Sequence, residues 1–319
     1  MRRGNTKEKI LKLLSRRDWT VAELVNRLKL SNQIIHRHLK ELQERDEVGK
    51  KGKMPKVYYF KKNNKESRIK ESKEYFAEKF LPKFLVKNNK NKTFLGLTAD
   101  NKNNHKINFD FLLTASALYS SNIEGNTLDL NSFLNQSVLS KQKKKEVAEI
   151  NDLKKAYLYA QKYKLTEKTF LQAHKILSKA LVSKNRQGKY REESVGVFGS
   201  RGLAYLAIES ELVKNEISLL FEEIAKLLEK KMTKQETFFW ALWIHLMLVL
   251  IHPFADGNGR IARITEKWFL AEKLGKDYWY LQTEKYYWDN LKEYYQNLNL
   301  GANYWAVDFN KTRAFFFDK

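Results

Sequence analysis

Residues 251–263 read Ile251-His252-Pro253-Phe254-Ala255-Asp256-Gly257-Asn258-Gly259-Arg260-Ile261-Ala262-Arg263 and lie between two apolar segments. The glycines on both sides of Asn258 let the main chain approach a ligand closely. A helix that begins at this point directs free N–H groups and its positive end at one place, which favours an anion. This run therefore predicts a phosphate-binding loop that leads into a helix.

Three kinds of side chain in this loop suit reactions of phosphates. Arg260 and Arg263 are three positions apart, so they share a helix face and can grip phosphate oxygens. Asp256 is suited to a Mg²⁺ that bridges phosphates. His252 can take a proton from a hydroxyl, because its ordinary pKa lies near neutrality. A His-Pro or a Gly-Asn-Gly alone would be a structural cap or turn, but together they favour transfer from a nucleotide polyphosphate to a hydroxyl.

The run from His252 to Arg263 resembles the signature of the Fic family, His-x-Phe-x-(Asp/Glu)-Gly-Asn-Gly-Arg-x-x-Arg, at every fixed position. The resemblance implies AMP transfer from ATP to a Ser, Thr or Tyr hydroxyl of a protein, which can be the chain itself. It implies these roles: His252 as the base, Asp256 as the Mg²⁺ ligand, Phe254 as the loop anchor, and Gly257, Asn258, Gly259, Arg260 and Arg263 as phosphate-binding residues. With glycine at position 259, the sequence resembles the AMP-transferring branch of the family, since the kinase-like Doc branch has Lys at this position.

A second motif lies well upstream of the first. Ser120-Ser121-Asn122-Ile123-Glu124-Gly125 follows an apolar helix predicted from residue 109, and Gly125 ends that helix. The run resembles the Fic inhibitory motif, (Ser/Thr)-x-x-x-Glu-(Gly/Asn). The resemblance implies that Ser120, Glu124 and Gly125 form an inhibitory element in which Glu124 pairs with Arg263 and keeps it from the γ-phosphate. The alternative is a surface Glu at a helix end.

The segment 195–206 is expected to form a β-hairpin, because two β-prone runs flank Gly and Ser. It resembles the flap that lies over the Fic site and pairs with the target main chain as an added strand. An ordinary surface hairpin is the alternative reading.

The helices that flank the signature carry three further expectations. His245 lies in the apolar run 238–251 and is expected to be a core histidine with satisfied hydrogen bonds. Lys267 stands where the family often has Asn, so any role of that Asn is not carried over to this chain. Residues 290–298 resemble the Glu-Tyr-Tyr helix that often follows the Fic core.

The N-terminal segment is unusually basic. Residues 1–70 hold 21 Lys and Arg against 8 Asp and Glu, whereas the other 249 residues hold 39 against 29. This uneven charge indicates a polyanion-binding module. The pattern over residues 5–62 resembles a winged helix-turn-helix, with three helices and a basic hairpin at 48–60.

The third helix of this module, predicted from Ser31 to about Arg45, is the candidate DNA-reading element. Ile35, Leu39 and Leu42 recur at helical spacing and are expected to face the core. The exposed side then carries side chains that read bases and contact phosphates. These candidate DNA-binding residues are Asn32, Gln33, His36, Arg37 and Lys40. Docking of a protein is the alternative, because such folds are also reused for that purpose.

The sequence thus predicts a mainly α protein with an all-helical Fic core and a small hairpin flap. The expected parts are a winged helix-turn-helix at 1–65, a linker and helical connector at 66–108, and a Fic domain at 109–319 with its inhibitory helix at 109–125. The absence of Cys excludes disulfides and thiolate metal sites. No signal peptide or membrane-spanning run is evident, so a cytoplasmic protein without a membrane partner is expected. The oligomeric state is open, with a homodimer as one option.

Two functions from different classes remain. One is a protein adenylyltransferase, a nucleotidyltransferase that uses ATP and Mg²⁺, is restrained by Glu124 and carries a DNA-binding module. The other is a DNA-binding transcription regulator whose Fic-like domain senses a nucleotide and transfers little. The intact His252, Asp256, Arg260 and Arg263 favour the enzyme, since a pure sensor would not need the base.

Overall fold

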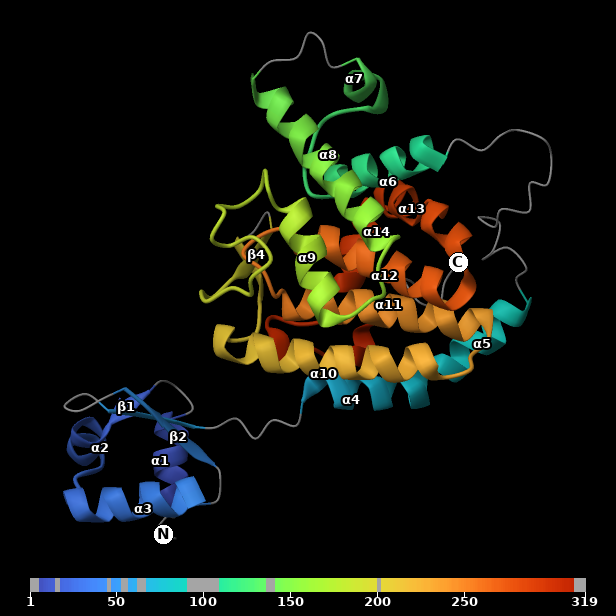
Figure 1. Cartoon of the computed structure of the whole chain (residues 1–319). Coiled ribbons are helices and arrows are strands. Elements are labelled where there is room, and N and C mark those ends of the chain that lie inside the picture. The colour runs from blue at the N-terminus through green and yellow to red at the C-terminus, as the bar shows by residue number, and fades with distance from the viewer. Residues whose placement is uncertain are drawn as a thin grey trace. The chain divides into compact units, whose positions relative to one another are not determined.

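The computed structural model is mostly helical, with two small sheets (Figure 1). The described residues are 6–14, 18–44, 47–52, 57–61, 67–90, 109–135, 141–199 and 202–312. The chain divides into two compact units, Met1–Glu66 and Ser67–Lys319. None of the helices in these ranges is long and apolar enough to cross a membrane. The predicted fold class, a helical core with a hairpin after a helix-turn-helix unit, is confirmed.

The first unit contains three helices and a three-stranded antiparallel sheet. Its elements are α1 Thr6–Leu14, β1 Trp19–Thr20, α2 Val21–Leu28, α3 Asn32–Glu44, β2 Val48–Lys51 and β3 Tyr58–Lys61, with strand order β1-β3-β2. A capping box begins α2, because Thr20 and Glu23 each accept a hydrogen bond from the other's main-chain N–H. Ile35, Leu39 and Leu42 of α3 are buried as predicted. The short strand β1 was not predicted.

The second unit is a helical bundle with one hairpin. Its helices are α4 Arg68–Tyr75, the π-helical η1 Phe76–Phe80, α5 Leu81–Lys90, α6 Phe109–Ile123, α7 Leu130–Leu134, α8 Lys141–Ala160, α9 Glu167–Leu177, α10 Ser210–Glu229, α11 Lys234–Ile251, α12 Asn258–Leu274, α13 Thr283–Asp289, α14 Leu291–Leu298, and three short 3-10 turns, Lys276–Tyr280, Tyr304–Ala306 and Phe309–Lys311. The hairpin consists of β4 Gly196–Gly199 and β5 Gly202–Leu206, within the predicted flap.

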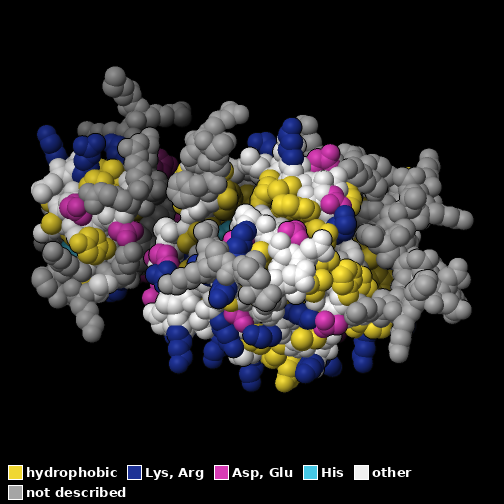
Figure 2. Space-filling model, turned by 90° about the horizontal axis from the view of Figure 1, so that it is seen from above, with side chains coloured by type: hydrophobic (Ala, Val, Ile, Leu, Met, Phe, Trp, Pro, Cys, Tyr) yellow, Lys and Arg dark blue, Asp and Glu magenta, His cyan; other side chains and the backbone are white. Residues whose placement is uncertain are grey.

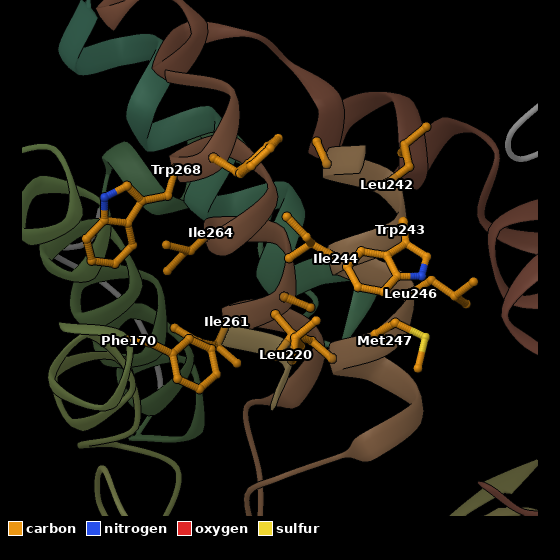
Figure 3. Close-up of a cluster of buried hydrophobic side chains, with 14 of the residues drawn as sticks. Phe170, Leu220, Leu242, Trp243, Ile244, Leu246, Met247, Ile261, Ile264 and Trp268 are labelled. Atoms are coloured by element: carbon orange, nitrogen blue, oxygen red, sulfur yellow. The ribbon is translucent and has the colours of Figure 1, made fainter. Parts of the chain in front are cut away.

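The two helices α11 and α12 form the centre of this bundle (Figure 1). A capping box between Thr233 and Glu236 begins α11, and Gly275 follows the end of α12 with a φ of 113°. Most residues of both helices are buried. Their apolar side chains pack against Phe170 of α9 and Leu220 of α10 (Figure 3). The loop between these two helices, residues 252–257, is therefore held at both ends by the core.

The segment 66–108, expected to be a linker and helical connector, is helical over Arg68–Lys90. Ile69, Phe76 and Phe84 are fully buried in the same core as α11. This part of the connector therefore belongs structurally to the second unit. Residues 91–108 lie outside the described residues.

Candidate active site

The loop that follows α11 turns through two left-handed residues. His252 has φ 53° and Gly257 has φ 83°. A Cβ added to Gly257 would lie 2.9 Å from Leu177 Cδ1. The positive φ and this close approach both favour glycine at the position. Asn258 closes the loop, because its amide donates to Phe254 O and accepts from Phe254 N–H, both at 2.8 Å. The Asn258 side chain, expected to cradle phosphates, shapes the loop here.

Phe254, for which the resemblance implied the role of loop anchor, lies in the core. Its ring is fully buried and is stacked on the His174 ring of α9, with centroids 3.5 Å apart. His174 Nδ1 accepts from Gly188 N–H at 3.1 Å, so Nε2 carries the proton and donates to Asp256 O at 2.9 Å. Burial lowers the pKa of His174 to about 4, and the ring is neutral. Sequence reasoning missed His174, although a histidine within the apolar face of α9 was a visible signal.

Arg191 is a second residue that sequence reasoning missed. It is 4% exposed and lies between α9 and β4. Its Nε donates to His252 O at 2.7 Å, and its main-chain N–H donates to Pro253 O at 3.0 Å. The arginine thus fixes the beginning of the loop, while His174 fixes its middle.

The His252 side chain is held as a neutral base. Its Nδ1 lies 3.2 Å from Val249 O, a group that can only accept, so the proton is on Nδ1, and no hydrogen bond from the described residues occupies the Nε2 lone pair. Burial lowers the pKa of His252, and the nearby Glu124 carboxylate only partly opposes this effect. The imidazole is therefore ready to take a proton at neutral pH.

Arg260 and Asp256 form a second, looser pair of charged side chains in the site. The Arg260 guanidinium is buried, but its ion pairs are long, 3.5 Å to Glu149 and 3.7 Å to Asp256. Among the described residues, its Nε has no hydrogen-bond partner. The Asp256 side chain is 53% exposed. Arg260 thus has donors left for an anion, and Asp256 has room for a cation.

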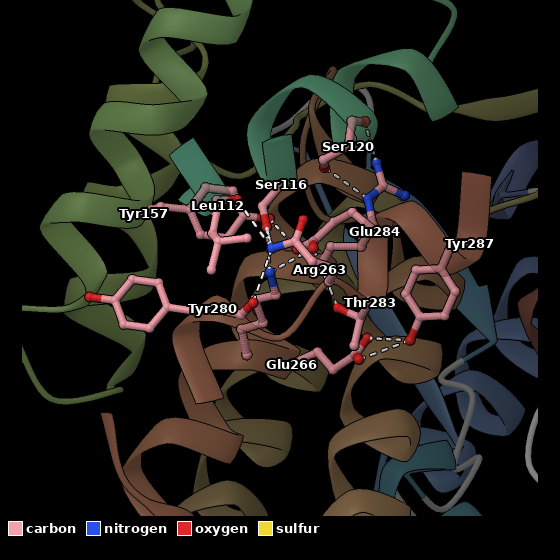
Figure 4. Close-up of polar contacts among 12 residues, drawn as sticks. Leu112, Ser116, Ser120, Tyr157, Arg263, Glu266, Tyr280, Thr283, Glu284 and Tyr287 are labelled. Carbon is pink, nitrogen blue, oxygen red and sulfur yellow. Dashed lines mark hydrogen bonds and ion pairs between the residues drawn. The ribbon is translucent and has the colours of Figure 1, made fainter. Parts of the chain in front are cut away.

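Arg263 is instead occupied by the second motif. Its Nε donates to Ser120 Oγ and its Nη2 donates to Ser120 O, both at 2.9 Å (Figure 4), and Nη2 also donates to Glu124 Oε1 at 2.6 Å. The guanidinium is fully buried, whereas 29% of the Glu124 side chain is exposed. Burial would raise the pKa of Glu124, but Arg263 outweighs it and holds that pKa below its usual range. The pairing of Arg263 with Glu124 that the motif implied is present.

Gly259 lies directly below the Glu124 carboxylate. A Cβ at this position would lie 2.1 Å from Glu124 Oε1 and 3.2 Å from Arg263 Nη1. The ion pair therefore depends on the absence of a side chain at residue 259. Gly125, the last residue of the second motif, has φ 94° and turns the chain after Glu124.

A buried polar network continues behind Arg263. Arg263 Nη1 donates to Tyr294 OH at 2.9 Å, and Tyr294 OH lies 3.0 Å from His245 Nε2. His245 Nδ1 is 2.6 Å from Glu266, which also accepts from Tyr287 OH (Figure 4). His245 is fully buried, so the expectation of a satisfied core histidine is confirmed.

Lys267, where the chain departs from the family pattern, is fully buried and takes part in another polar cluster. Its Nζ forms an ion pair with Glu284 at 2.6 Å and donates to Ser116 Oγ at 2.7 Å (Figure 4). Glu284 also accepts from Tyr157 OH at 2.6 Å. The lysine therefore joins α12 to α6 and α13.

The flap is attached to the end of α11. Tyr205 of β5 donates through its OH to Leu250 O at 2.6 Å. Val197, Leu203 and Leu206 of the hairpin are exposed. The hairpin is thus tied to the end of α11 by Tyr205 and carries exposed apolar side chains.

In the first unit, α3 places the five candidate DNA-binding residues together. Asn32, Gln33, His36, Arg37 and Lys40 are all exposed, whereas the intervening Ile35 and Leu39 are buried. The basic hairpin expected at 48–60 includes Lys53 and Lys56, which lie outside the described residues. On the face of the molecule seen in Figure 2, many Lys and Arg side chains, drawn in dark blue, project from the surface.

Two family models match the chain. The model of the Fic/DOC family matches residues 164–270, which include α9, the hairpin, α10, α11 and the signature loop. These residues are a Fic domain. A model described as bacterial regulatory protein, arsR family, matches residues 5–46, which cover α1 to α3. No curated protein is similar enough to the chain to count as a match.

One solved structure with the same overall fold supports this architecture, and two further structures are similar over parts of the chain. A Fic family protein from Desulfovibrio desulfuricans G20 is 23% identical, with a TM-score of 0.51 over 68% of this chain and 63% of that chain. The chain therefore spans less than two thirds of that relative. A Fic domain containing signaling protein from Bacteroides thetaiotaomicron is 19% identical over 78% and 90% of the two chains, with a TM-score of 0.49. Fic-1 from C. elegans is 19% identical over 54% and 53%, with a TM-score of 0.41.

Proposed function

We propose that the chain is a protein adenylyltransferase, which moves AMP from ATP to a Ser, Thr or Tyr hydroxyl of a protein and is restrained by Glu124. The observation that carries the proposal is the contrast between the two signature arginines beside a neutral His252. Arg260 retains donors for phosphate, whereas Arg263 is bound by Glu124. This arrangement suits an anion site with one half in place and one half blocked.

In the proposed reaction, the target hydroxyl oxygen bonds to the α-phosphorus of ATP. The bond from that phosphorus to the oxygen that bridges the α- and β-phosphates breaks, and pyrophosphate leaves. His252 Nε2 takes the hydroxyl proton as the new bond forms. Arg260 and the N–H groups in the first turn of α12 stabilise the charge on the phosphates, because those N–H groups have no partner within the helix.

Asp256 would hold the Mg²⁺ that accompanies ATP. The described residues contain no group of three or more His, Cys, Asp or Glu side chains that could bind a metal by themselves. This fits Mg²⁺, which commonly binds through one or two carboxylates and takes its other ligands from phosphates and water. When bound, Mg²⁺ neutralises phosphate charge.

Restraint would follow from competition for Arg263. Four hydrogen bonds already hold its guanidinium, to Ser120 Oγ, Ser120 O, Glu124 and Tyr294. A γ-phosphate would have to replace Glu124 on this arginine. Without that contact, ATP is poorly aligned for in-line attack on its α-phosphorus, and transfer is slow.

Labelled ATP tests the proposal. The wild type, Glu124→Gly and His252→Ala are incubated separately with ATP labelled at the α- or the γ-phosphate. We expect α-label on protein, more of it with Glu124→Gly and none with His252→Ala. Protein labelled from the γ-phosphate would indicate a kinase instead. No label with Glu124→Gly would favour the nucleotide sensor.

We further propose that the first unit binds duplex DNA through α3, in a protein that works in the cytoplasm, where ATP and DNA are both present. The exposed set on α3 supports this, because its side chains can reach base edges and phosphates. Binding should weaken steeply as salt is added, since phosphate contacts release counterions. Affinity that is independent of salt would contradict the proposal and favour a protein-docking unit.

A further inference from the structure

Arg191 makes an unusual set of contacts for a residue outside the signature. Its guanidinium donates to the carbonyl oxygens of His252 at 2.7 Å, Ile208 at 2.5 Å and Glu193 at 2.8 Å, and more weakly to Ile251 O at 3.4 Å. All of these acceptors are main-chain groups. Through these contacts, the Arg191 side chain joins the end of α11 to the residues that flank the hairpin.

The His252 main chain needs such support. A non-glycine residue with φ 53° is strained and persists only where the surroundings enforce it. Two groups on Arg191 enforce it, since Nε holds the carbonyl of His252 and the main-chain N–H holds that of Pro253. This conformation brings Nδ1 of the ring to Val249 O and leaves Nε2 without a hydrogen bond from the described residues.

We propose that Arg191 is a positioning residue for the base, which locks the main chain at His252 and thereby presents Nε2 of a single neutral tautomer to the substrate hydroxyl. The proposal rests on the proposed function, because it assumes that His252 is the base. Among the described residues, the guanidinium of Arg191 donates to main-chain carbonyls, and it acts through His252.

The charges around His252 define what the loss of Arg191 would do. Glu124 beyond the end of α6 and Asp256 of the loop raise the pKa of His252, whereas Arg191 lowers it. Arg191 has Glu193, Glu209 and Glu211 among its own acidic neighbours. Removal of the guanidinium should therefore raise the pKa of His252 and also release its carbonyl.

The test compares Arg191→Gln and Arg191→Lys in the Glu124→Gly background. Nitrogen-15 NMR of histidine-labelled protein reports the tautomer and the pKa of His252, with the signal assigned by loss in His252→Ala. Steady-state transfer of α-label from ATP gives kcat and KM. Lys273→Met is the matched control, because Lys273 also donates to main-chain carbonyls, of Leu228 and Lys230, but at the far end of α12.

We expect Arg191→Gln to show both tautomers, a higher His252 pKa and a kcat lower by roughly 10- to 100-fold with KM little changed, since small misplacement of a catalytic group costs about that much. Arg191→Lys should lie between Gln and wild type, and Lys273→Met should leave the His252 spectrum unchanged. If Arg191→Gln does not fold, Arg191→Lys is judged by the same criteria.

An unchanged tautomer in the folded Arg191 variants would overturn the proposal, whether or not kcat falls. The NMR result does not depend on transfer. If none of the variants labels protein, the proposed function is refuted. The NMR spectra would still show whether Arg191 holds the imidazole.

Discussion

Arg263 and Glu124 are 139 positions apart in the chain, yet Nη2 of the first donates to Oε1 of the second at 2.6 Å. Two further contacts accompany this ion pair. Ser120 accepts from the same arginine, and Ser116 accepts from Lys267, one turn further along α12. Ser116, Ser120 and Glu124 follow one another at intervals of four. One face of α6 and the turn after it is therefore bound to one face of α12.

Removal of the charge at Glu124 should release Arg263 for the γ-phosphate. The gain in kcat/KM should reflect the free energy of the hydrogen bond that is lost. A hydrogen bond between charged groups contributes about 1.5–3 kcal/mol, so Glu124→Gly should raise kcat/KM for ATP roughly 10- to 100-fold. Glu124→Gln keeps the shape of the side chain and should give a smaller rise. Transfer of α-label measures both, with Glu229→Gln as an exposed control at the end of α10. Equal rates in wild type and Glu124→Gly would contradict the role of Glu124.

Gly259→Ala should have opposite effects in two backgrounds. In the wild type the added Cβ collides with Glu124 Oε1, the end of a flexible side chain, so Glu124 is displaced and transfer increases. In the Glu124→Gly variant there is no carboxylate to displace, and the methyl group only narrows the phosphate site, so transfer decreases. The two rates relative to their parents are the measurement. A rate that changes in the same direction in both backgrounds would contradict the displacement of Glu124 by the added methyl group.

The pH profile should show an acid limb below the usual histidine range. His252 is a base only when neutral, and burial lowers its pKa below 6.5 in the free protein, so kcat/KM falls only when the pH drops through that lowered value. Glu124 raises the His252 pKa, so the limb should lie at still lower pH in Glu124→Gly than in the residual wild-type activity. Because Arg263 holds the Glu124 pKa below 4.5, acidification to about pH 5 should not relieve the restraint. A limb above pH 6.5 would contradict the neutral-base assignment.

Lys267→Met should destabilise the second unit strongly. It leaves the Glu284 carboxylate buried without its cation, which typically costs about 3–5 kcal/mol. Lys267→Met combined with Glu284→Gln should recover part of the loss. Urea unfolding measures the change, and Lys285→Met serves as the control because its ion pair with Asp289 is half exposed and should matter little. A small effect of Lys267→Met alone would show that Glu284 finds another partner.

Lys40→Ala and Arg37→Ala should weaken duplex binding by the first unit. Loss of one phosphate contact should reduce affinity similarly for all sequences and lower the salt slope by about one. Loss of a base contact should instead relax sequence preference. Fluorescence anisotropy over a salt series distinguishes the two, with the exposed Lys9→Ala on α1 as the control. Unchanged affinity in both variants would place the nucleic-acid surface elsewhere or remove it.

Much of the fold could be predicted because its signals are local. The capping boxes at Thr20 and Thr233 mark helix starts within four residues, and the spacing of Ile35, Leu39 and Leu42 defines the buried side of α3. The pairing of Glu124 with Arg263 was implied only by the resemblance to the inhibitory motif. No local pattern connects two residues so far apart.

The partners of His174 and Arg191 could not be predicted for the same reason. Their partners are main-chain groups of the signature loop, 82 and 61 positions away, and any residue type can supply a carbonyl. Such contacts leave no complementary partner residue in the sequence. The π-helical turn at Phe76–Phe80 was not predicted either, and its two phenylalanines are buried in the core.

The left-handed conformation of His252 bears on how an inactive variant should be chosen. Alanine is poorly suited to φ 53°, so His252→Ala removes the base and also invites the loop to relax. Asparagine tolerates this region of backbone space better than other substitutes with a side chain, and its amide can still donate to Val249 O. His252→Asn is thus the cleaner reagent, since it removes the proton acceptor and preserves the shape of the loop that a nucleotide would meet.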